Sequence, residues 1–137
     1  MPAFTVTDKQ VAKFNEDGYL LVEGLFNEEE MDLLLNIGKQ DQEKSAIVDN
    51  LVDAEGRESK LWLTCEVGDD IYTAICHSRR VTDTMDALLN DEVYLYHYKM
   101  MVKEPKVGGA WEWHQDYGYW YGNECLYPDM GLSRIHI

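Results

Sequence analysis

Several features that would indicate other classes of protein are scarce in this chain of 137 residues. Its three cysteines are odd in number and none lies in a Cys-x-x-Cys pair, which favours reduced thiols over a disulfide framework. Lys and Arg total 12 against 26 Asp and Glu, and the net charge of −14 disfavours nucleic acid and anionic membranes as partners. No basic leader with an apolar core and no run of about 18 apolar residues is present, so we expect a soluble, cytoplasmic protein.

The residues that are present are typical of one globular domain. Apolar residues make up 45% of the chain and charged residues 28%, which is an ordinary globular composition. A chain of this length can bury a modest core, and no repeat or interdomain linker divides it.

The first two thirds of the chain read mainly as helices. Thr7 and Gln10 have the spacing of a capping box, and Gly18 is placed to end the helix that follows. A second helix is expected to begin after Asn27, with acidic residues in its first turn, and to end at Gly38. The further expectations are a short strand at 19–22, a polar helix extension and loop at 39–59, a strand at 60–65, and helices after 69–70 and around 81–89.

The sequence changes character after Glu92. Residues 93–102 are rich in aromatic and aliphatic side chains without a helix breaker, which predicts one long strand. Its two faces would carry Tyr94, Tyr96, Tyr98, Met100 and Val102 on one side, and Val93, Leu95, His97, Lys99 and Met101 on the other. Helices first and strands second indicate an α+β fold whose few strands leave open sheet edges.

The pattern with the clearest chemistry is His114-Gln115-Asp116, set among aromatic residues at 111–120. In an extended strand, residues two apart project from the same face, so His114 and Asp116 can converge on one ion. One imidazole nitrogen and one carboxylate are two thirds of a 2-His-1-carboxylate triad, the arrangement that leaves positions open on non-heme Fe(II). His and Asp at this spacing also occur in ordinary surface hydrogen bonds, and the aromatic setting and preceding strand favour the metal interpretation.

Other candidate residues have simpler interpretations. His97 lies on the strand face opposite the tyrosines and is more typical of a packed or exposed side chain than of a ligand. His77 is most simply a residue at a helix end, and Trp111 and Trp113 can serve packing alone. The tyrosine stripe is more typical of a core or of a barrel lining than of an active site.

Three segments in this order resemble the phytanoyl-CoA dioxygenase family of Fe(II)/2-oxoglutarate oxygenases. The first is 14–26, a Phe-x-x-x-Gly-Tyr junction from helix to strand. The second is 98–105, which is similar to the strand before the family's metal motif. The third is 113–116 with the following Trp120, which is similar to the ectoine-hydroxylase branch. The resemblance extends from Thr7 to Met130. It implies a double-stranded β-helix, a jelly-roll barrel, preceded by helices. Residues 1–91 would then be the helical N-terminal part of a single domain, 92–130 the first barrel strands, and 131–137 an atypical tail.

The resemblance also implies a set of ligands. Fe(II), 2-oxoglutarate and O2 would be the cofactor and cosubstrates, with His114 and Asp116 as metal ligands and no side chain assigned as a catalytic acid or base. The remaining implied contacts are Met100 and Gln115 near the 2-oxoglutarate, Tyr98 and Lys99 as further cosubstrate candidates from their strand position, and Tyr119 and Trp120 near the substrate mouth.

The carboxyl end departs from the family pattern. In the family, a distal His is followed by an Arg that pairs with the 2-oxoglutarate carboxylate. Here Arg134 precedes His136, and His136 lies much closer to His114 than in the family. We therefore expect neither residue to act as a substitute. The sequence predicts an incomplete barrel, and a 137-residue form that is inactive unless a partner chain completes it.

Two functions follow as hypotheses. The first is an oxygenase that hydroxylates a C–H bond of a small molecule. The alternative is a non-catalytic, acidic interaction or regulatory fragment, whose open sheet edge pairs with another protein or with a second copy.

Overall fold

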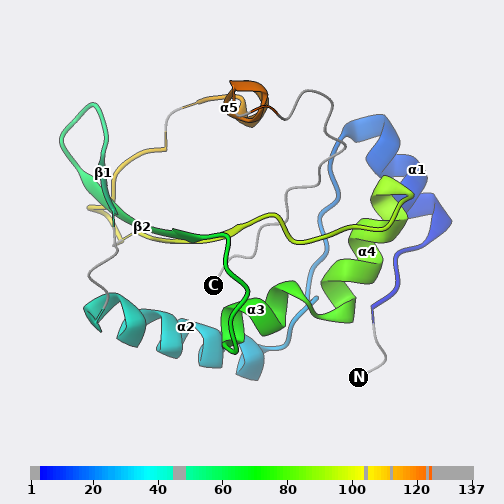
Figure 1. The fold of residues 1–137 in the computed structure, drawn as a ribbon, viewed down its shortest axis with the longest axis horizontal. Helices are drawn as coiled ribbons and strands as arrows, with labels where there is room; N and C mark the ends of the chain where they lie inside the picture. The colour runs from blue at the N-terminus through cyan, green and yellow to red at the C-terminus, as the bar shows by residue number, and fades with distance from the viewer. Residues whose placement is uncertain (1–3, 45–48, 104, 112, 123, 125–137) are drawn as a thin grey trace.

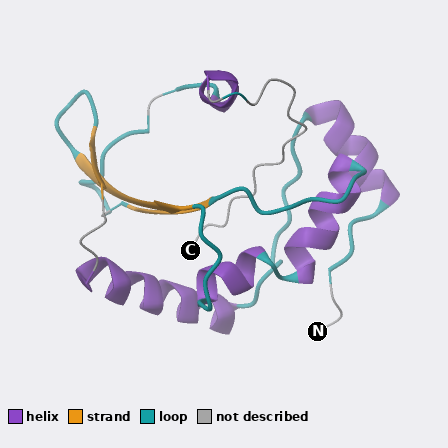
Figure 2. Cartoon of the chain, viewed as in Figure 1, coloured by secondary structure: helices purple, strands orange, loops and turns teal. Residues whose placement is uncertain are grey.

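The structure is a computed structural model that describes residues 4–44, 49–103, 105–111, 113–122 and 124. These residues form a mixed α+β arrangement of five helices and a small, open sheet of three strands, which confirms the expected class (Figures 1 and 2). In chain order the elements are α1 (Asp8–Asp17), α2 (Glu28–Lys44), β1 (Asp49–Val52), β2 (Glu58–Thr64), α3 (Ile71–Cys76), α4 (Arg79–Leu89), β3 (Tyr98–Val102) and α5 (Asp116–Gly122).

Local capping signals place the starts of the first helices. The Thr7 side chain accepts a hydrogen bond from the backbone of Gln10, and the Gln10 side chain accepts one from Thr7, so the expected capping box is confirmed. Gly18 closes α1 with a φ of 82°, a left-handed conformation that glycine adopts without strain. Asn27 and Glu30 form the same reciprocal pair of hydrogen bonds at the start of α2, at 2.9 and 2.8 Å.

The prediction that Gly38 ends α2 was wrong, because the helix continues to Lys44. A Cβ atom added at Gly38 would lie 2.9 Å from the Met100 sulfur on β3. Gly38 therefore allows α2 to approach the sheet closely, and its role belongs to tertiary packing rather than to helix termination.

The sheet is antiparallel, in the order β1-β2-β3. The strand expected at 60–65 is confirmed by β2, which pairs Leu61 with Met101 and Trp62 with Met100. The loop expected over 39–59 was wrong in part, because β1 lies within it and forms a hairpin with β2. The hairpin turn includes Gly56, whose φ is 78°.

Two further strand predictions were wrong. Residues 19–22 have no regular structure, and the Leu21 side chain is 77% exposed, so this apolar run is not packed in a sheet. The long strand expected at 93–102 is limited to Tyr98–Val102, the residues that hydrogen-bond to β2. A run of β-favouring residues becomes a strand only where a partner strand is available to bond it.

Different elements lie on the two sides of the sheet, as Figure 1 shows, with α2 and α3 on one side and α5 on the other. We call the first the helix side and the second the α5 side. On the helix side, Trp62, Tyr72 and Tyr98 form an aromatic cluster with ring centroids 5.4 to 6.2 Å apart. On the α5 side, Trp120 packs its ring 5.0 Å from both Tyr96 and His97.

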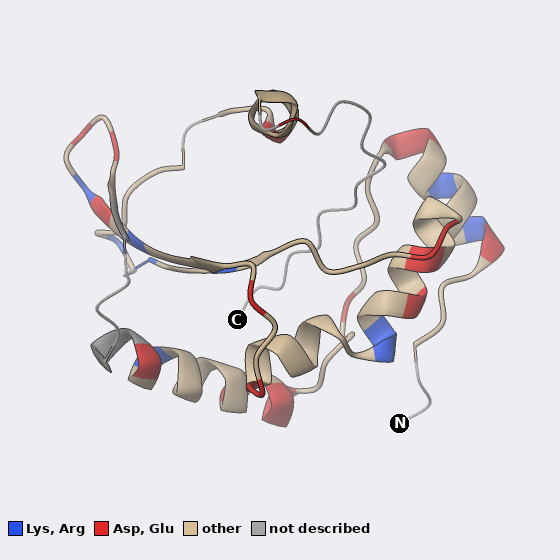
Figure 3. Cartoon of the chain, in the orientation of Figure 1, with Lys and Arg blue, Asp and Glu red and all other residues tan. Residues whose placement is uncertain are grey.

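Charged side chains lie mainly on the outer helices. Figure 3 shows acidic residues on α1, at the start of α2 and on α4, whereas α5 carries an acidic residue only in its first turn. Among the described helices, none combines the length and the apolar character needed to span a bilayer.

Candidate metal centre

His114 and Asp116 come together just before and at the start of α5. The strand predicted for this motif was wrong, because His114 lies in an irregular segment and Asp116 is the first residue of the helix. An acidic side chain in the first turn is favoured by the helix dipole, which supports this local structure. The two side chains still converge, with His114 Nε2 lying 3.3 Å from Asp116 Oδ1. They are 43% and 45% exposed, so the pair is open to a ligand from solvent.

The ring of His114 is oriented by Trp111. The indole Nε1–H of Trp111 donates a hydrogen bond of 3.0 Å to His114 Nε2. An indole is a donor only, so Nε2 accepts this bond through a lone pair. Nε2 thus accepts a hydrogen bond from Trp111 and lies close to Oδ1 of Asp116, and nitrogen and oxygen atoms of these two kinds are common ligands of divalent metal ions.

The pair fits two neighbouring ligands of a divalent metal ion. Nitrogen and oxygen ligands that bind one ion at about 2.1 Å and at right angles lie about 3 Å apart, close to the observed 3.3 Å. A metal ion on His114 Nε2 would take the place of the indole hydrogen. That exchange costs about 1 kcal/mol, the net contribution of one neutral hydrogen bond.

Within the described part of the chain, no three His, Cys, Asp or Glu side chains are grouped closely enough to hold a metal ion. His136 and Arg134, which we do not expect to replace the family's distal His and Arg, lie outside the described residues. The candidate centre therefore consists of two ligands, and their assignment as ligands stays a prediction.

The cosubstrate candidates on β3 lie on opposite faces of the sheet. Lys99 is on the α5 side, where its Nζ lies 5.3 Å from the centroid of the Trp111 ring. Tyr98 and Met100 are on the helix side: Tyr98 donates a 3.4 Å hydrogen bond to Asp70, and Met100 packs beside Gly38. Burial raises the pKa of Tyr98, which keeps its hydroxyl protonated. The structure thus brings only Lys99 of these three to the side of His114.

The other candidates from the motif differ in burial. Gln115 and Tyr119 are exposed, whereas Trp120 is 8% exposed and is the buried residue of α5. The ring of His97 stacks on Trp120 with 25° between the planes, so His97 is a packed side chain, as expected. Burial, with a smaller contribution from Lys99, lowers the pKa of His97. The roles proposed for Gln115, Tyr119 and Trp120 stay predictions.

His77 is the C-terminal cap of α3, which confirms the expected position at a helix end. Its side chain is exposed and is not grouped with the candidate ligands.

Sequence reasoning missed the residues that anchor the segment before the motif. Gly109 donates a backbone hydrogen bond to Glu58 and its carbonyl accepts one from Ser59, at 3.1 and 3.3 Å. Ala110 N–H donates to the carboxylate of Asp53 at 2.8 Å. The available signal was the Asp-x-x-Gly turn pattern at 53–56 within the polar stretch, which predicts a turn but not its contact with Ala110.

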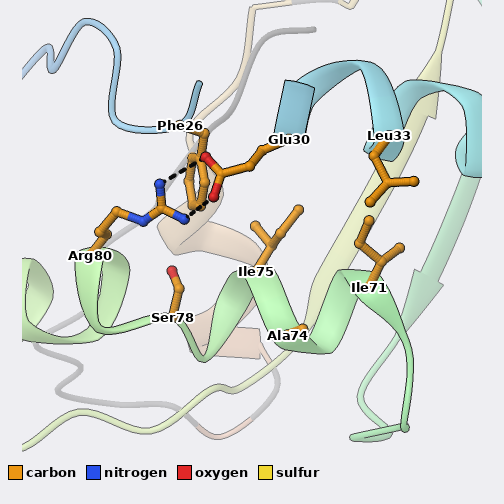
Figure 4. A pocket seen from close by; sticks show the side chains of 8 residues that line it. All are labelled: Phe26, Glu30, Leu33, Ile71, Ala74, Ile75, Ser78 and Arg80. Carbon is orange, nitrogen blue, oxygen red and sulfur yellow. Dashed lines mark hydrogen bonds and ion pairs between the residues drawn. The ribbon is translucent and has the colours of Figure 1, made fainter. Parts of the chain in front are cut away.

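A separate pocket of about 230 Å³ lies between α2, α3 and the start of α4 (Figure 4). The carboxylate of Glu30 and the guanidinium of Arg80 form a two-pronged ion pair at its rim, and Leu33 and Ile71 face one another across it. No candidate ligand or cosubstrate residue lines this pocket.

Comparisons with known proteins give a consistent family assignment. The sequence model of the family described as Phytanoyl-CoA dioxygenase (PhyH) matches residues 14–135. The chain is 24% identical over 131 residues to ectoine dioxygenase of Sphingopyxis alaskensis, which covers 93% of this chain and 43% of that protein. For ectoine dioxygenase of Bordetella bronchiseptica the identity is 25% over 127 residues, covering 90% and 41%. For L-proline trans-4-hydroxylase of Streptomyces griseoviridis it is 27% over 62 residues, covering 45% and 23%. The chain thus spans less than half the length of these curated relatives.

Proposed function

Because the chain belongs to the phytanoyl-CoA dioxygenase family, we propose that it supplies His114 and Asp116 as iron ligands of an Fe(II)/2-oxoglutarate-dependent oxygenase. The observation that supports this proposal most directly is the 3.3 Å approach of His114 Nε2 to Asp116 Oδ1. An imidazole nitrogen and a carboxylate oxygen are the donor types of the facial triad, which leaves other positions on the ion open. The third protein ligand is proposed to come from a segment outside the described residues.

The proposed reaction is hydroxylation of a C–H bond in a small molecule. The relatives include ectoine dioxygenases and an L-proline trans-4-hydroxylase, whose names describe oxidation of small molecules. Iron, with 2-oxoglutarate and O2, would supply the oxidising chemistry. The role of this chain's own residues would be to hold the ion on one side and to bind the cosubstrate and substrate around it.

Among the cosubstrate candidates, Lys99 is the best placed to bind a carboxylate of 2-oxoglutarate. Its ammonium group lies on the α5 side beside Trp111. An ammonium group binds a carboxylate through charge-assisted hydrogen bonds. Tyr119 is proposed to contact the substrate from the exposed face of α5.

Metal titration of the 137-residue chain tests the proposal. Co(II) is a suitable probe because its absorption spectrum reports bound nitrogen and oxygen ligands, and Fe(II) is then tested without oxygen. We expect weak, saturable binding at neutral pH, with loss of at least about tenfold in affinity in His114→Ala and in Asp116→Ala. Turnover of 2-oxoglutarate is expected to be absent when the chain is assayed alone.

His77→Ala is the matched control, because it removes an exposed histidine from the end of α3. The assignment would be contradicted if both ligand substitutions left the Co(II) affinity unchanged while His77→Ala lowered it. Tight Fe(II) binding with turnover would show that a third ligand is present in this chain, and His136→Ala would then identify it.

A second candidate function is association through the open sheet edge. In the described part of the chain, β3 pairs with β2 on one side and has no strand on its other side. An unpaired edge offers backbone donors and acceptors to another chain. Light scattering on the purified chain at low and high salt tests this function: we propose a dimer that persists at high salt, and a monomer at all concentrations would contradict it.

A further inference from the structure

Asp53 is a charged side chain that is almost completely enclosed. Its carboxylate is only 1% exposed and accepts hydrogen bonds from four groups: the backbone N–H of Glu55, Arg57 and Ala110 at 2.9, 2.8 and 2.8 Å, and the Arg57 side chain at 2.9 Å. Three of these donors belong to the β1–β2 turn itself. The fourth, Ala110, is 57 positions further along the chain. These donors hold the pKa of Asp53 well below its usual range, with the Ala110 bond as the largest cause.

The neighbour of Ala110 is fixed on the same hairpin. Gly109 exchanges hydrogen bonds with Glu58 and Ser59, and the Ser59 side chain is buried. A Cβ atom at Gly109 would lie 2.6 Å from the Arg57 carbonyl oxygen, closer than a real Cβ atom comes to another backbone. The segment therefore lies directly against the turn, and we call Asp53, Ser59, Gly109 and Ala110 the turn clamp.

The turn clamp is one residue away from the group that orients His114. Trp111 follows Ala110 directly, and its indole donates to His114 Nε2 at 3.0 Å. The ammonium group of Lys99 on β3 lies over the face of the Trp111 ring. A continuous series of contacts thus runs from the buried carboxylate in the hairpin turn to the nitrogen that faces Asp116.

We propose that Asp53 is a positioning residue of the candidate metal centre, which sets the backbone at Gly109–Trp111 and, through Trp111, the ring of His114. The proposal rests on the proposed function, because it concerns the geometry of the same ligand pair. A charged acceptor suits this task because hydrogen bonds to a carboxylate are shorter and roughly twice as strong as neutral ones. Asp53 touches neither ligand, so it acts through the segment that it holds.

The test compares Asp53→Asn with the unaltered chain by NMR spectroscopy. The side-chain amide keeps the size of Asp53 but removes its charge, and its NH2 group faces the two donors that share one of the carboxylate oxygens. We expect the indole N–H resonance of Trp111, assigned with a Trp111→Phe variant, to shift towards that of a solvent-exposed indole. Hydrogen exchange at the Ala110 amide should become about tenfold faster, the equivalent of one lost hydrogen bond. Co(II) affinity should fall by at least roughly tenfold.

Glu30→Gln is the matched control for loss of a carboxylate. It removes the partner of Arg80 on the other side of the sheet and should lower the unfolding temperature. It should leave the Trp111 resonance, the Ala110 exchange rate and the Co(II) affinity unchanged. An equal effect of Glu30→Gln on these three readouts would assign Asp53 a general structural role and overturn the proposal.

A milder variant decides the matter if Asp53→Asn does not fold. Ser59→Ala removes one hydrogen bond to Gly109 and leaves the carboxylate in place. A smaller shift of the Trp111 resonance in the same direction supports the proposal, and an unchanged resonance in the folded variant overturns it. If the unaltered chain binds no Co(II), the proposed function fails for this chain, whereas the resonance and exchange readouts still decide whether Asp53 positions His114.

Discussion

The two sides of the sheet carry similar aromatic residues that differ in exposure. On the helix side, the rings of Trp62, Tyr72 and Tyr98 pack against one another. On the α5 side, Trp113 is fully exposed, and the exposed aromatic residues also include Trp111, Tyr117, Tyr119 and Tyr121. Rings that are buried against one another stabilise the fold, whereas the rings around His114 and Asp116 leave apolar surface exposed.

The sides also differ in how they are held. The helix side is joined by the aromatic cluster, by the hydrogen bond of Tyr72 with Asp41 and by the ion pair of Glu30 with Arg80. The α5 side is held at separate points, chiefly Trp120 under α5 and the turn clamp before the motif. Segments with few buried contacts open more readily, and binding segments are often of this kind. The following substitutions test whether the two sides behave as separate units.

The largest effect is expected from Trp120→Ala. This substitution removes the ring that packs on Tyr96 and His97 and leaves α5 without its buried side chain. We expect a loss of roughly 2–3 kcal/mol in the free energy of unfolding, at or below the low end for a core tryptophan, because Tyr96 is itself half exposed. Urea denaturation followed by circular dichroism measures it.

Hydrogen exchange shows which amides lose protection in Trp120→Ala. Faster exchange should be confined to the α5 side, with the amides of α2 and α3 protected as before. Equal loss of protection on both sides would mean that the molecule unfolds as one unit, and the comparison would fail. Tyr117→Ala is a matched control on the exposed face of α5 and should have a much smaller effect.

The second-largest effect on stability is expected from Glu30→Gln, and its size depends on pH. Hydrogen bonds from Arg80, and then from the backbone of Asn27, lower the pKa of Glu30 from 4.5 to about 2 in the folded chain. A pKa lower in the folded state than in the unfolded state means that the charged form stabilises the fold. This contribution is fully present above about pH 4.5 and is lost as the pH falls towards 2.

Thermal unfolding at several pH values checks this dependence. At pH 7 the variant should unfold several degrees below the unaltered chain, and the difference should shrink between pH 4.5 and 2. A difference that stays constant over this range would show that the carboxylate charge of Glu30 contributes nothing. Glu16→Gln, which removes an exposed partner of Lys13 on α1, is the control and should have little effect at any pH.

The parts of the structure that depend on neighbouring residues were predictable from sequence. The caps at Thr7 and Asn27 are local patterns, because the side chain accepts a hydrogen bond from an N–H group only three residues further along the chain. The three segments at 14–26, 98–105 and 113–116 identified the family because residue identities in order are sufficient for that purpose, and the family match confirms it. The convergence of His114 and Asp116 was predicted, although for a strand rather than for the start of a helix.

The parts that depend on distant residues were not predictable. Gly38 looks like a helix end, and only its contact with Met100 explains why the helix continues through it. β1 and the turn that joins it to β2 lie in a stretch whose composition is that of a loop. The sequence around Asp53 does not indicate its hydrogen bond with Ala110, because that contact exists only after the sheet has formed. For the same reason, the sequence did not show that Tyr96 would pack on Trp120 beside His97 instead of sharing a face with Tyr98.

The smallest effect is expected from Tyr72→Phe, which probes the helix side without disturbing its packing. The Tyr72 hydroxyl donates a 2.9 Å hydrogen bond to Asp41 near the end of α2, and burial raises its pKa well above the usual value. Loss of this bond should lower the free energy of unfolding by about 1 kcal/mol, while the ring remains in the aromatic cluster. Tyr94→Phe is the matched control, because Tyr94 is largely exposed and its hydroxyl can be hydrated in either state. If the two sides are independent, Tyr72→Phe leaves the Trp111 indole resonance unchanged. A shift comparable to that of Ser59→Ala would mean that the helix side also sets the position of His114.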